Sequence, residues 1–417
     1  MQYILSILNF FTMSVHSKNY IKRPVYLNRA KKYLDTNLIK LFTGQRRIGK
    51  SYLMLQLIDE IEQLNPAANI IFIDKELYDF EFMKTADHLV TYVNERLQTG
   101  VKNYLFIDEV QEIQSFEQAL RSFLNLGVVD IWCTGSNAQI LSGELTDRLS
   151  GRYIEIRVHG LSYTEFLMFH KLPDDNHSLD VYMKFGGLPN LINLPSDDNL
   201  IFDYLKVINA TVLLKDIIKR HQIRNVAILE SLIKFIADNT GSLFSSTSIS
   251  KLLKSQGEKL SSSVISNYIG YILDSYYLIK VQRSDLQGKK IFETNEKYYF
   301  EDLGLRNAWV GYRPIHVNKL IENVVFKHLL QQGFAITVGS IGDKEIDFVA
   351  DMSGDKVYVQ CAYLLKNEST REREFGNLLK INDNYRKIVV SMDEPAGGNV
   401  SGIEHLHLRT FLTSVFK

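Results

Sequence analysis

The segment from Gly44 to Ser51 reads GQRRIGKS and carries the residues of a phosphate-binding loop. It fits the pattern G-x-x-x-x-G-K-[ST] at every fixed position. Glycines let backbone N–H groups approach phosphate oxygens, a lysine reaches the terminal phosphates, and a serine hydroxyl is a ligand for Mg²⁺. The residues predicted to line a nucleotide are Gly44, Gln45, Arg46, Arg47, Ile48, Gly49, Lys50, Ser51 and Tyr52.

A second motif, NYLFIDEV, ends an apolar run with the acidic residues Asp108 and Glu109. A parallel sheet presents its ligand-facing edge where such strands end. We therefore expect Asp108 to hold Mg²⁺ together with Ser51, and Glu109 to polarise an attacking water. The alternative is two acidic residues that cap a strand in solvent, but the loop upstream favours the functional interpretation.

The run IWCTGSNAQIL ends in small polar residues, and LTDRLSGRY supplies two arginines. Asn137 or Ser136 is a candidate for orienting the water or sensing the terminal phosphate. Arg148 and Arg152 are candidates for neutralising charge in the transition state, within one subunit or from a neighbour in an oligomer. Surface solvation or ordinary ion pairing is an equal alternative for both arginines.

Alternating strand and helix patterns surround these motifs from residue 38 to about 158. The helical patterns are KSYLMLQLIDEIEQL and SFEQALRSFLNLG, with Gly127 as the expected end of the second. The expected strands are Leu38 to Thr43, Ile70 to Asp74, Tyr104 to Asp108, Ile131 to Thr134 and Tyr153 to Val158. This alternation predicts an α/β fold, a P-loop parallel sheet sandwiched by helices.

Helices replace strands after His159. LSYTEFLMFHKL, a break at GGLP and FDYLKVINATVLLKDIIKRH indicate a helical lid. Further helices then precede a hairpin pattern around Gly288, which is typical of a winged helix. From about Ile315, a helix and strand-like runs such as EIDFVAD and KVYVQCAYLL predict a small α/β unit.

The bulk composition is that of a soluble globular protein of 417 residues. Its 48 basic and 48 acidic residues cancel, so any contact with nucleic acid must be local. Cys133 and Cys361 lie far apart in apolar stretches, which favours free thiols and a reducing, cytoplasmic compartment. The opening MQYILSILNFFTM is too short to cross a bilayer, so we expect no membrane role; it either precedes a true start at Met13 or forms a short docked helix.

Taken together, GQRRIGKSYL, YLFIDEVQEI and TGSNAQILSGELTDRLSGRY, followed by LSYTEF, resemble the AAA-type ATPase domain that occurs with a C-terminal domain of the DUF4143 type. The resemblance implies a strand order of 5-1-4-3-2 and ATP as the nucleotide. It also implies that Lys50 and Ser51 bind phosphate and Mg²⁺, that Asn137 is the sensor, and that Arg152 is favoured over Arg148.

The final section resembles the PD-(D/E)xK nuclease fold through Glu322, Asp347 and Gln360. The resemblance implies a second metal site on these three residues, but Ala362 stands where an active member carries a lysine. Because the ammonium would stabilise the transition state, we expect cleavage to be crippled unless Lys344 or Lys366 replaces it. A module that binds a partner or nucleic acid, and an ordinary strand with one core-facing Asp, are the alternatives.

The implied domains are an N-terminal extension over 1–20, an AAA-type P-loop ATPase domain over 21–160, a helical lid over 161–225, a winged helix over 226–310 and a PD-(D/E)xK-like domain over 311–417. Residues that leave DNA contact open in the winged helix are Lys251, Lys254, Lys259, Ser261, Ser262, Ser263, Arg283, Lys289 and Lys290. Solvated faces explain them equally well.

The sequence thus predicts an ATP-binding, Mg²⁺-dependent ATPase that couples its nucleotide state to movement of the winged-helix and C-terminal domains. A nucleotide-locked signalling or DNA-binding switch with little turnover is the alternative, and a metal-dependent nuclease is less favoured. ATP is the expected ligand, and DNA, a protein partner and an oligomer stay open.

Overall fold

The computed structural model describes residues 20–141, 151–255, 260–286, 288, 295–365, 368–394 and 399–416. The chain divides into two compact units, Met1–Val158 and His159–Lys417, and each is described by itself. The features predicted at residues 1–19, including the start at Met13, and at Arg148, Lys259, Lys289, Lys290 and Lys366 lie outside the described residues.

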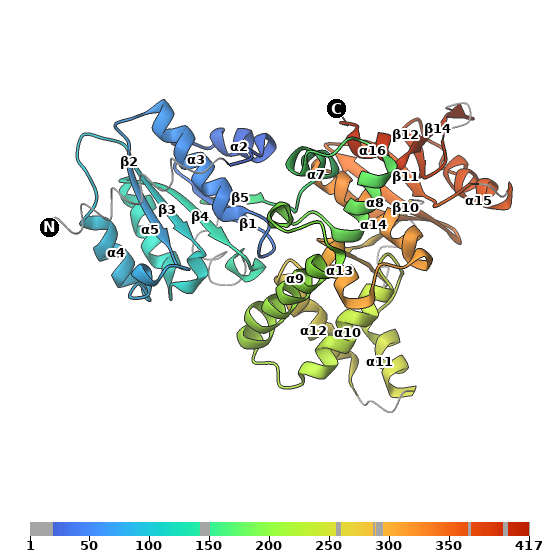
Figure 1. Cartoon of the computed structure of the whole chain (residues 1–417), viewed down its shortest axis with the longest axis horizontal. Coiled ribbons are helices and arrows are strands. Elements are labelled where there is room, and N and C mark those ends of the chain that lie inside the picture. Colours follow the sequence, from blue (N-terminus) through green and yellow to red (C-terminus); the bar gives the residue numbers. More distant parts are fainter. Residues whose placement is uncertain are drawn as a thin grey trace. The chain divides into compact units, whose positions relative to one another are not determined.

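The first unit is built on a five-stranded sheet in the order β2-β3-β4-β1-β5, with every pair parallel (Figure 1). Its strands are β1 (Ile39–Thr43), β2 (Asn69–Asp74), β3 (Asn103–Asp108), β4 (Asp130–Gly135) and β5 (Tyr153–Arg157). The order confirms the predicted 5-1-4-3-2 arrangement of a P-loop fold. Because β3, β4 and β1 are parallel neighbours, their carboxyl ends meet at one edge of the sheet.

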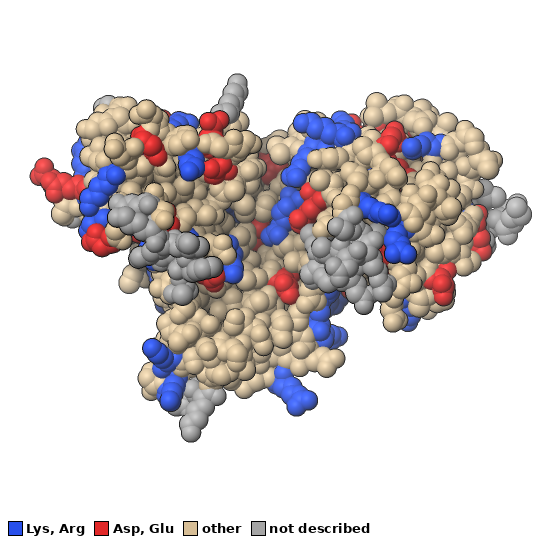
Figure 2. All heavy atoms as spheres, turned by 180° about the vertical axis from the view of Figure 1, so that it is seen from behind, with Lys and Arg blue, Asp and Glu red and all other residues tan. Residues whose placement is uncertain are grey.

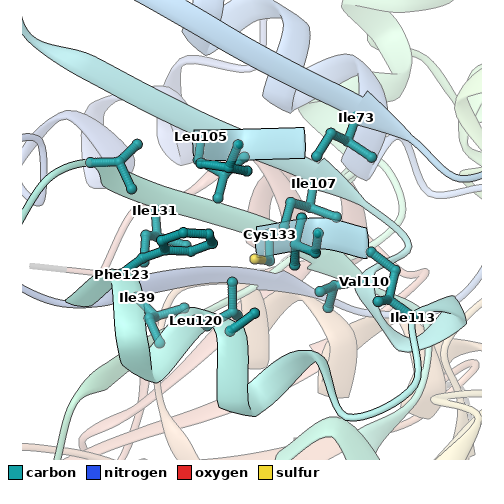
Figure 3. Close-up of a cluster of buried hydrophobic side chains, with 14 of the residues drawn as sticks. Ile39, Ile73, Leu105, Ile107, Val110, Ile113, Leu120, Phe123, Ile131 and Cys133 are labelled. Atoms are coloured by element: carbon teal, nitrogen blue, oxygen red, sulfur yellow. The ribbon is translucent and has the colours of Figure 1, made fainter. Parts of the chain in front are cut away.

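Helices cover both faces of this sheet. They are α2 (Pro24–Lys31), α3 (Lys50–Leu64), α4 (Ala86–Asn94) and α5 (Phe116–Leu126), with the short turns η1 (Tyr78–Phe80), η2 (Val110–Glu112) and η3 (Ala138–Leu141). Figure 3 shows Leu120 and Phe123 of α5 directed at Ile39, Ile131 and other strand residues on one face. Gly127, in a left-handed conformation, ends α5 as predicted.

The other face of the sheet carries an aromatic row. Trp132 stacks on Phe42 and Phe106, with ring centroids 5.7 and 6.3 Å away. These rings lie on the face opposite Ile131 and Cys133, since successive strand residues point to opposite faces. Helix α3 packs on this side, so burial on both faces fixes the register of the strands. The sheet is therefore a rigid base for the side chains at its edge.

The second unit opens with helices. They are α7 (Tyr163–His170), α8 (Asn176–Phe185), η4 (Pro189–Asn193), α9 (Asp198–Thr211) and a π-helical turn η5 (Val212–Lys219). Ser162 and Glu165 form a capping box at the start of α7. Helix α8 adds an element that the sequence patterns had not indicated.

Further helices and three short strands follow. Their bounds are α10 (Val226–Asp238), α11 (Ser246–Ser255), α12 (Ser262–Asp274), β6 (Leu278–Val281), β7 (Arg283–Asp285), β8 (Lys297–Phe300) and α13 (Leu303–Val310). β6 and β8 pair antiparallel, as a hairpin requires. The prediction of a simple two-stranded hairpin is wrong in one respect: the segment between β6 and β8 contains a third strand, β7, which pairs in parallel with β9.

The chain ends in a seven-stranded sheet in the order β13-β14-β12-β11-β10-β9-β7. Its remaining elements are η6 (Pro314–His316), α14 (Val317–Gln331), β9 (Ala335–Ile341), β10 (Lys344–Met352), β11 (Asp355–Cys361), α15 (Glu368–Leu379), β12 (Arg386–Ser391), β13 (Asn399–Val400), β14 (Ile403–His407) and α16 (Leu408–Thr413). This sheet and its helices confirm the predicted α/β unit in the C-terminal part of the chain. No helix within the described ranges is long and apolar enough to cross a membrane.

Candidate functional site

The predicted phosphate-binding loop lies between β1 and α3, and its backbone needs glycine. Gly44 has a φ of 138°, and a Cβ there would lie 2.3 Å from the carbonyl oxygen of Val158. Gly49 has a φ of 94° and directly precedes α3. Conformations of this kind are strained for residues that carry a Cβ, so both fixed glycines have a physical reason.

Lys50 folds back across its own loop. Its ammonium donates to the backbone carbonyls of Gly44 and Gln45, both at 3.0 Å, and its side chain is buried. Within the described structure, the side-chain amide of Gln45 is buried and has no hydrogen-bond partner. A loop that encloses an ammonium and leaves a buried amide unpaired fits an anionic, polar ligand such as the phosphates of a nucleotide.

The predicted metal residues lie together at the sheet edge. The carboxylate of Asp108 accepts hydrogen bonds from the hydroxyls of Thr134 and Ser51. Burial raises the pKa of Asp108 to about 6, and the hydrogen bond from Thr134 opposes this rise. A buried carboxylate beside a serine hydroxyl offers the hard oxygen ligands that Mg²⁺ prefers.

Glu109 follows in a left-handed conformation, with a φ of 54°. Its backbone N–H donates to the Thr134 hydroxyl at 2.8 Å, and its carboxylate accepts from Ser136 at 3.0 Å and from the amide of Gln111. The Lys50 ammonium lies 4.0 Å from the same carboxylate. Burial acts to raise the pKa of Glu109, but the charges of Lys50 and Arg46, together with the hydrogen bonds from Gln111 and Ser136, lower it. A lowered pKa favours the ionised form of this carboxylate.

Two residues that the sequence analysis did not assign complete this arrangement. Gln111 hydrogen-bonds both Glu109 and Ser136, and Glu76 pairs with the guanidinium of Arg46 at 3.0 Å. Gln111 lies only two residues beyond the acidic pair, which was the available signal. Glu76 follows the end of β2, a neighbouring strand, and no motif marked it.

The rest of the loop is braced or exposed. The guanidinium of Arg23 donates to the Ile48 carbonyl at 3.2 Å, so the segment before α2 supports the loop. Arg47 is exposed, with a φ of 71°. Tyr52 is 54% exposed and meets Tyr20 edge to face, with ring centroids 5.6 Å apart. Arg47 and Tyr52 therefore lie at the border of the loop, whereas Arg23 contacts its backbone.

Asn137 lies at the predicted edge, whereas Arg152 does not. Asn137 is buried after β4, and its Nδ2 has no hydrogen-bond partner in the part of the chain that the structure describes. Arg152 precedes β5, donates to Asn125 at 2.8 Å, and its carbonyl accepts from Ile39 at the start of β1. Strand β1 is five residues long, so roughly 15 Å separates Arg152 from the loop at the other end of the strand. The structure therefore does not bring Arg152 to the loop of its own subunit.

The second predicted site is also assembled in space. Glu322 on α14, Asp347 on β10 and Gln360 on β11 line one cavity of about 460 Å³, together with Ala362. Asp347 accepts from the backbone N–H of Cys361 at 2.8 Å, and the Gln360 side chain accepts from the Asp347 N–H at 3.3 Å. We refer to Glu322, Asp347 and Gln360, with Glu345 and Lys297, as the second polar centre.

Lys297 supplies an ammonium that the sequence analysis did not find. It comes from β8 and lies 2.7 Å from Glu322, 2.7 Å from Glu345 and 3.6 Å from Asp347. Lys344, one predicted replacement, instead pairs with Asp343 at 3.6 Å and is 43% exposed. No sequence motif connects Lys297 to Asp347, because tertiary packing alone brings β8 to β10.

The strand order, the loop and the acidic pair at the sheet edge define an AAA-type P-loop protein. Residues 36–167 match the family described as an AAA domain. Residues 176–315 match a domain of unknown function, DUF8612. The predicted DUF4143 assignment is not confirmed, since the second match is to a different family and lies largely upstream of the terminal sheet.

Relatives extend this similarity over almost the whole chain. An uncharacterized protein of Haemophilus influenzae is 34% identical over 402 residues, which is 95% of this chain and 99% of that protein. The chain therefore belongs to the same family as this protein. The uncharacterized protein MJ1544 of Methanocaldococcus jannaschii is 29% identical over 387 residues, 87% of this chain and 84% of that one.

A solved structure shares the fold. The Walker-type ATPase paby2304 of Pyrococcus abyssi superposes with a TM-score of 0.51 at 15% identity, covering 70% of this chain and 97% of that chain. At this identity the likeness supports the architecture alone.

Proposed function

We propose that the protein binds ATP with Mg²⁺ at the loop Gly44 to Ser51 and hydrolyses it. The observation that carries this proposal is the convergence of Lys50, Ser51, Asp108 and Glu109 at one edge of the sheet. Asp108 contacts Ser51, and the Glu109 carboxylate lies 4.0 Å from the Lys50 ammonium. This set contains a phosphate-binding cation, two metal ligands and a group that polarises water.

Each residue then has a role in an in-line attack of water on the terminal phosphate. Lys50 exchanges its bonds to the loop carbonyls for bonds to phosphate oxygens, and Ser51 with Asp108 would hold Mg²⁺. The ion, when bound, neutralises charge on the phosphates. Glu109 orients the water and accepts its proton, and the unpaired Nδ2 of Asn137 is available to sense the terminal phosphate. An arginine acting in trans, such as Arg152 of a neighbouring copy, stays a proposal that needs an oligomer.

We further propose that the nucleotide state changes the orientation of the two units. Val158, the last residue of the first unit, donates to Thr43 at 2.8 Å, and its carbonyl lies against Gly44. The next residue, His159, is held within the second unit by Glu301 at 2.9 Å. A shift of the loop would therefore act on a short covalent connection that is anchored at both ends.

A nucleotide-locked switch is the second candidate, and the state of Glu109 favours it. Its carboxylate is already hydrogen-bonded by Gln111 and Ser136, so those bonds must rearrange before it can orient a water. Bound nucleotide with very slow turnover would support the switch.

We also propose that α10, α11, α12 and the pair β6 and β8 form a winged helix that contacts DNA. Lys251 and Lys254 on α11 are exposed, and Ser261 caps α12. Figure 2 shows basic and acidic side chains spread over the visible face, so attraction to DNA would depend on a local cluster. We also propose a PD-(D/E)xK-like fold for the terminal α/β section. Its elements follow one another along the chain as α14, β9, β10, β11, α15 and β12, which supports this fold.

Titration with Mg²⁺-ATP tests the binding site. Lys50→Ala should weaken binding about tenfold or more, since it removes a charge-assisted contact to phosphate. Lys84→Ala is the matched control, because Lys84 is an exposed lysine of the same unit. Equal affinity for the Lys50 variant and the control would remove the proposed ATP site.

A further inference from the structure

The second polar centre surrounds a buried ammonium. The Lys297 side chain is 3% exposed and meets carboxylates from two different elements, Glu322 of α14 and Glu345 and Asp347 of β10. Burying an ammonium is costly unless it is paired, and the largely buried carboxylates of Glu322 and Asp347, 15% and 11% exposed, are also costly without a cation. Lysine and carboxylates therefore each need the other.

A nuclease-like fold implies a divalent cation among these oxygens, but the residues present do not fit one. The carboxylate oxygen of Glu322 nearest Lys297 also accepts from the Tyr299 hydroxyl at 2.6 Å. One oxygen of Asp347 accepts from the Cys361 N–H, while the other faces Lys297 at 3.6 Å. Among the described residues, no group of three or more His, Cys, Asp or Glu side chains is arranged to hold a metal ion.

We infer that Lys297 takes the place of the divalent cation, so that the second polar centre is a metal-independent ion cluster that fastens β8 to α14 and β10. A lysine in this position differs from the lysine of an active nuclease, which shares its site with a metal. Here one ammonium bridges all three carboxylates. This also explains why Ala362 is tolerated at the usual lysine position: the positive charge is supplied by another strand. The inference is independent of ATP binding.

The binding of Mn²⁺ to the apo protein tests this inference, with bound ions counted from the loss of the free-ion EPR signal. All proteins carry Asp108→Asn, which removes the loop carboxylate from the count. The parent and Asp347→Asn should bind the same number of ions. Lys297→Met should gain one site, at least about tenfold tighter than any weak binding of the parent, because a unit positive charge has gone. Adding Asp347→Asn to Lys297→Met should abolish the gained site.

Lys280→Met is the matched control, because Lys280 lies on the partner strand β6 and pairs with Glu296 instead. It should gain no Mn²⁺ site. If the parent binds one more ion than Asp347→Asn, or if a folded Lys297→Met gains none, the inference is wrong. Mn²⁺-dependent DNA cleavage by the wild type that is lost in both Asp347→Asn and Lys297→Met would also overturn it. Should Lys297→Met fail to fold, the parent and Asp347→Asn decide the question alone.

Discussion

At the scale of single residues, Thr134 organises the acidic pair. Its hydroxyl donates to Asp108 and accepts from the backbone N–H of Glu109, which holds Glu109 in a left-handed conformation that few residues with a Cβ adopt. Strain of this kind persists only where the surroundings fix it, and it concentrates at functional sites. Ser136 and Gln111 then set the direction of the Glu109 carboxylate.

Gln111 should therefore act as a positioning residue. If Gln111→Ala leaves Glu109 free to adopt other rotamers, kcat should fall about tenfold with KM for ATP almost unchanged, the loss expected for one hydrogen bond to a charged group. Steady-state phosphate release measures both constants, and Gln114→Ala, an exposed neighbour, is the control. A rise in kcat would instead mean that Gln111 restrains Glu109, as the switch requires.

The sequence was informative at this scale wherever the chemistry lies in a contiguous motif. Lys50, Ser51, Asp108 and Glu109 follow strands whose ends meet at one sheet edge, so motif and sheet direction together predicted their convergence. Lys297 was not predictable, because its partners are brought to it only by tertiary packing. Arg152 was favoured only by the resemblance, and its place directly before β5, at the end of the strand away from the loop, gave no support for a role in the site of its own subunit.

At the scale of elements, α14 carries a histidine whose environment makes stability depend on pH. His328 lies between Phe411 of α16 and Phe416, with ring centroids 5.3 and 6.1 Å away. Burial lowers its pKa to about 4, although a backbone hydrogen bond with Ser414 opposes this. Unfolding returns the ring to water, where its pKa is near 6.5. Between pH 4 and pH 6.5 this histidine binds more protons in the unfolded chain than in the folded one. The contribution of the neutral, buried His328 ring to the free energy of unfolding is therefore complete above about pH 6.5 and is lost as pH falls toward 4.

Because of His328, we expect the free energy of unfolding to be about 2 kcal/mol lower at pH 5 than at pH 7. Denaturant titrations at both pH values measure this loss. His328→Phe keeps the aromatic packing and should lose less stability over the same range, while the exposed His177→Phe should behave as the wild type. Identical pH dependence in all three proteins would contradict the account.

Local pattern explains which elements could be predicted. Helix α3 spans the predicted residues, because apolar side chains recur at helical spacing from Lys50 onward. β7 could not be foreseen, since the choice between continuing a hairpin and joining β9 depends on a strand some fifty residues away along the chain. Strand β9 itself begins with an exposed Ala335 and contains Gly339, which weakens its β pattern.

At the scale of the whole molecule, two compact units follow one another at Val158 and His159. The sequence predicted the type of the first unit fully, because its motifs and strand alternation agree. The limits proposed within 161–225, 226–310 and 311–417 stay predictions, since the contacts join 159–417 into one unit. Strand pairing such as that of β7 with β9 crosses the proposed boundary near residue 310.

The most direct test is the release of phosphate from Mg²⁺-ATP by the wild type, Glu109→Gln and the exposed control Glu112→Gln, each with and without duplex DNA. We predict that the wild type and Glu112→Gln turn over ATP, and that Glu109→Gln binds ATP with similar affinity but loses turnover at least about a hundredfold. Stimulation by DNA would support the winged-helix contact. Equal turnover by Glu109→Gln and the wild type, or tight ATP binding without turnover in any of the three, would contradict the proposed hydrolysis.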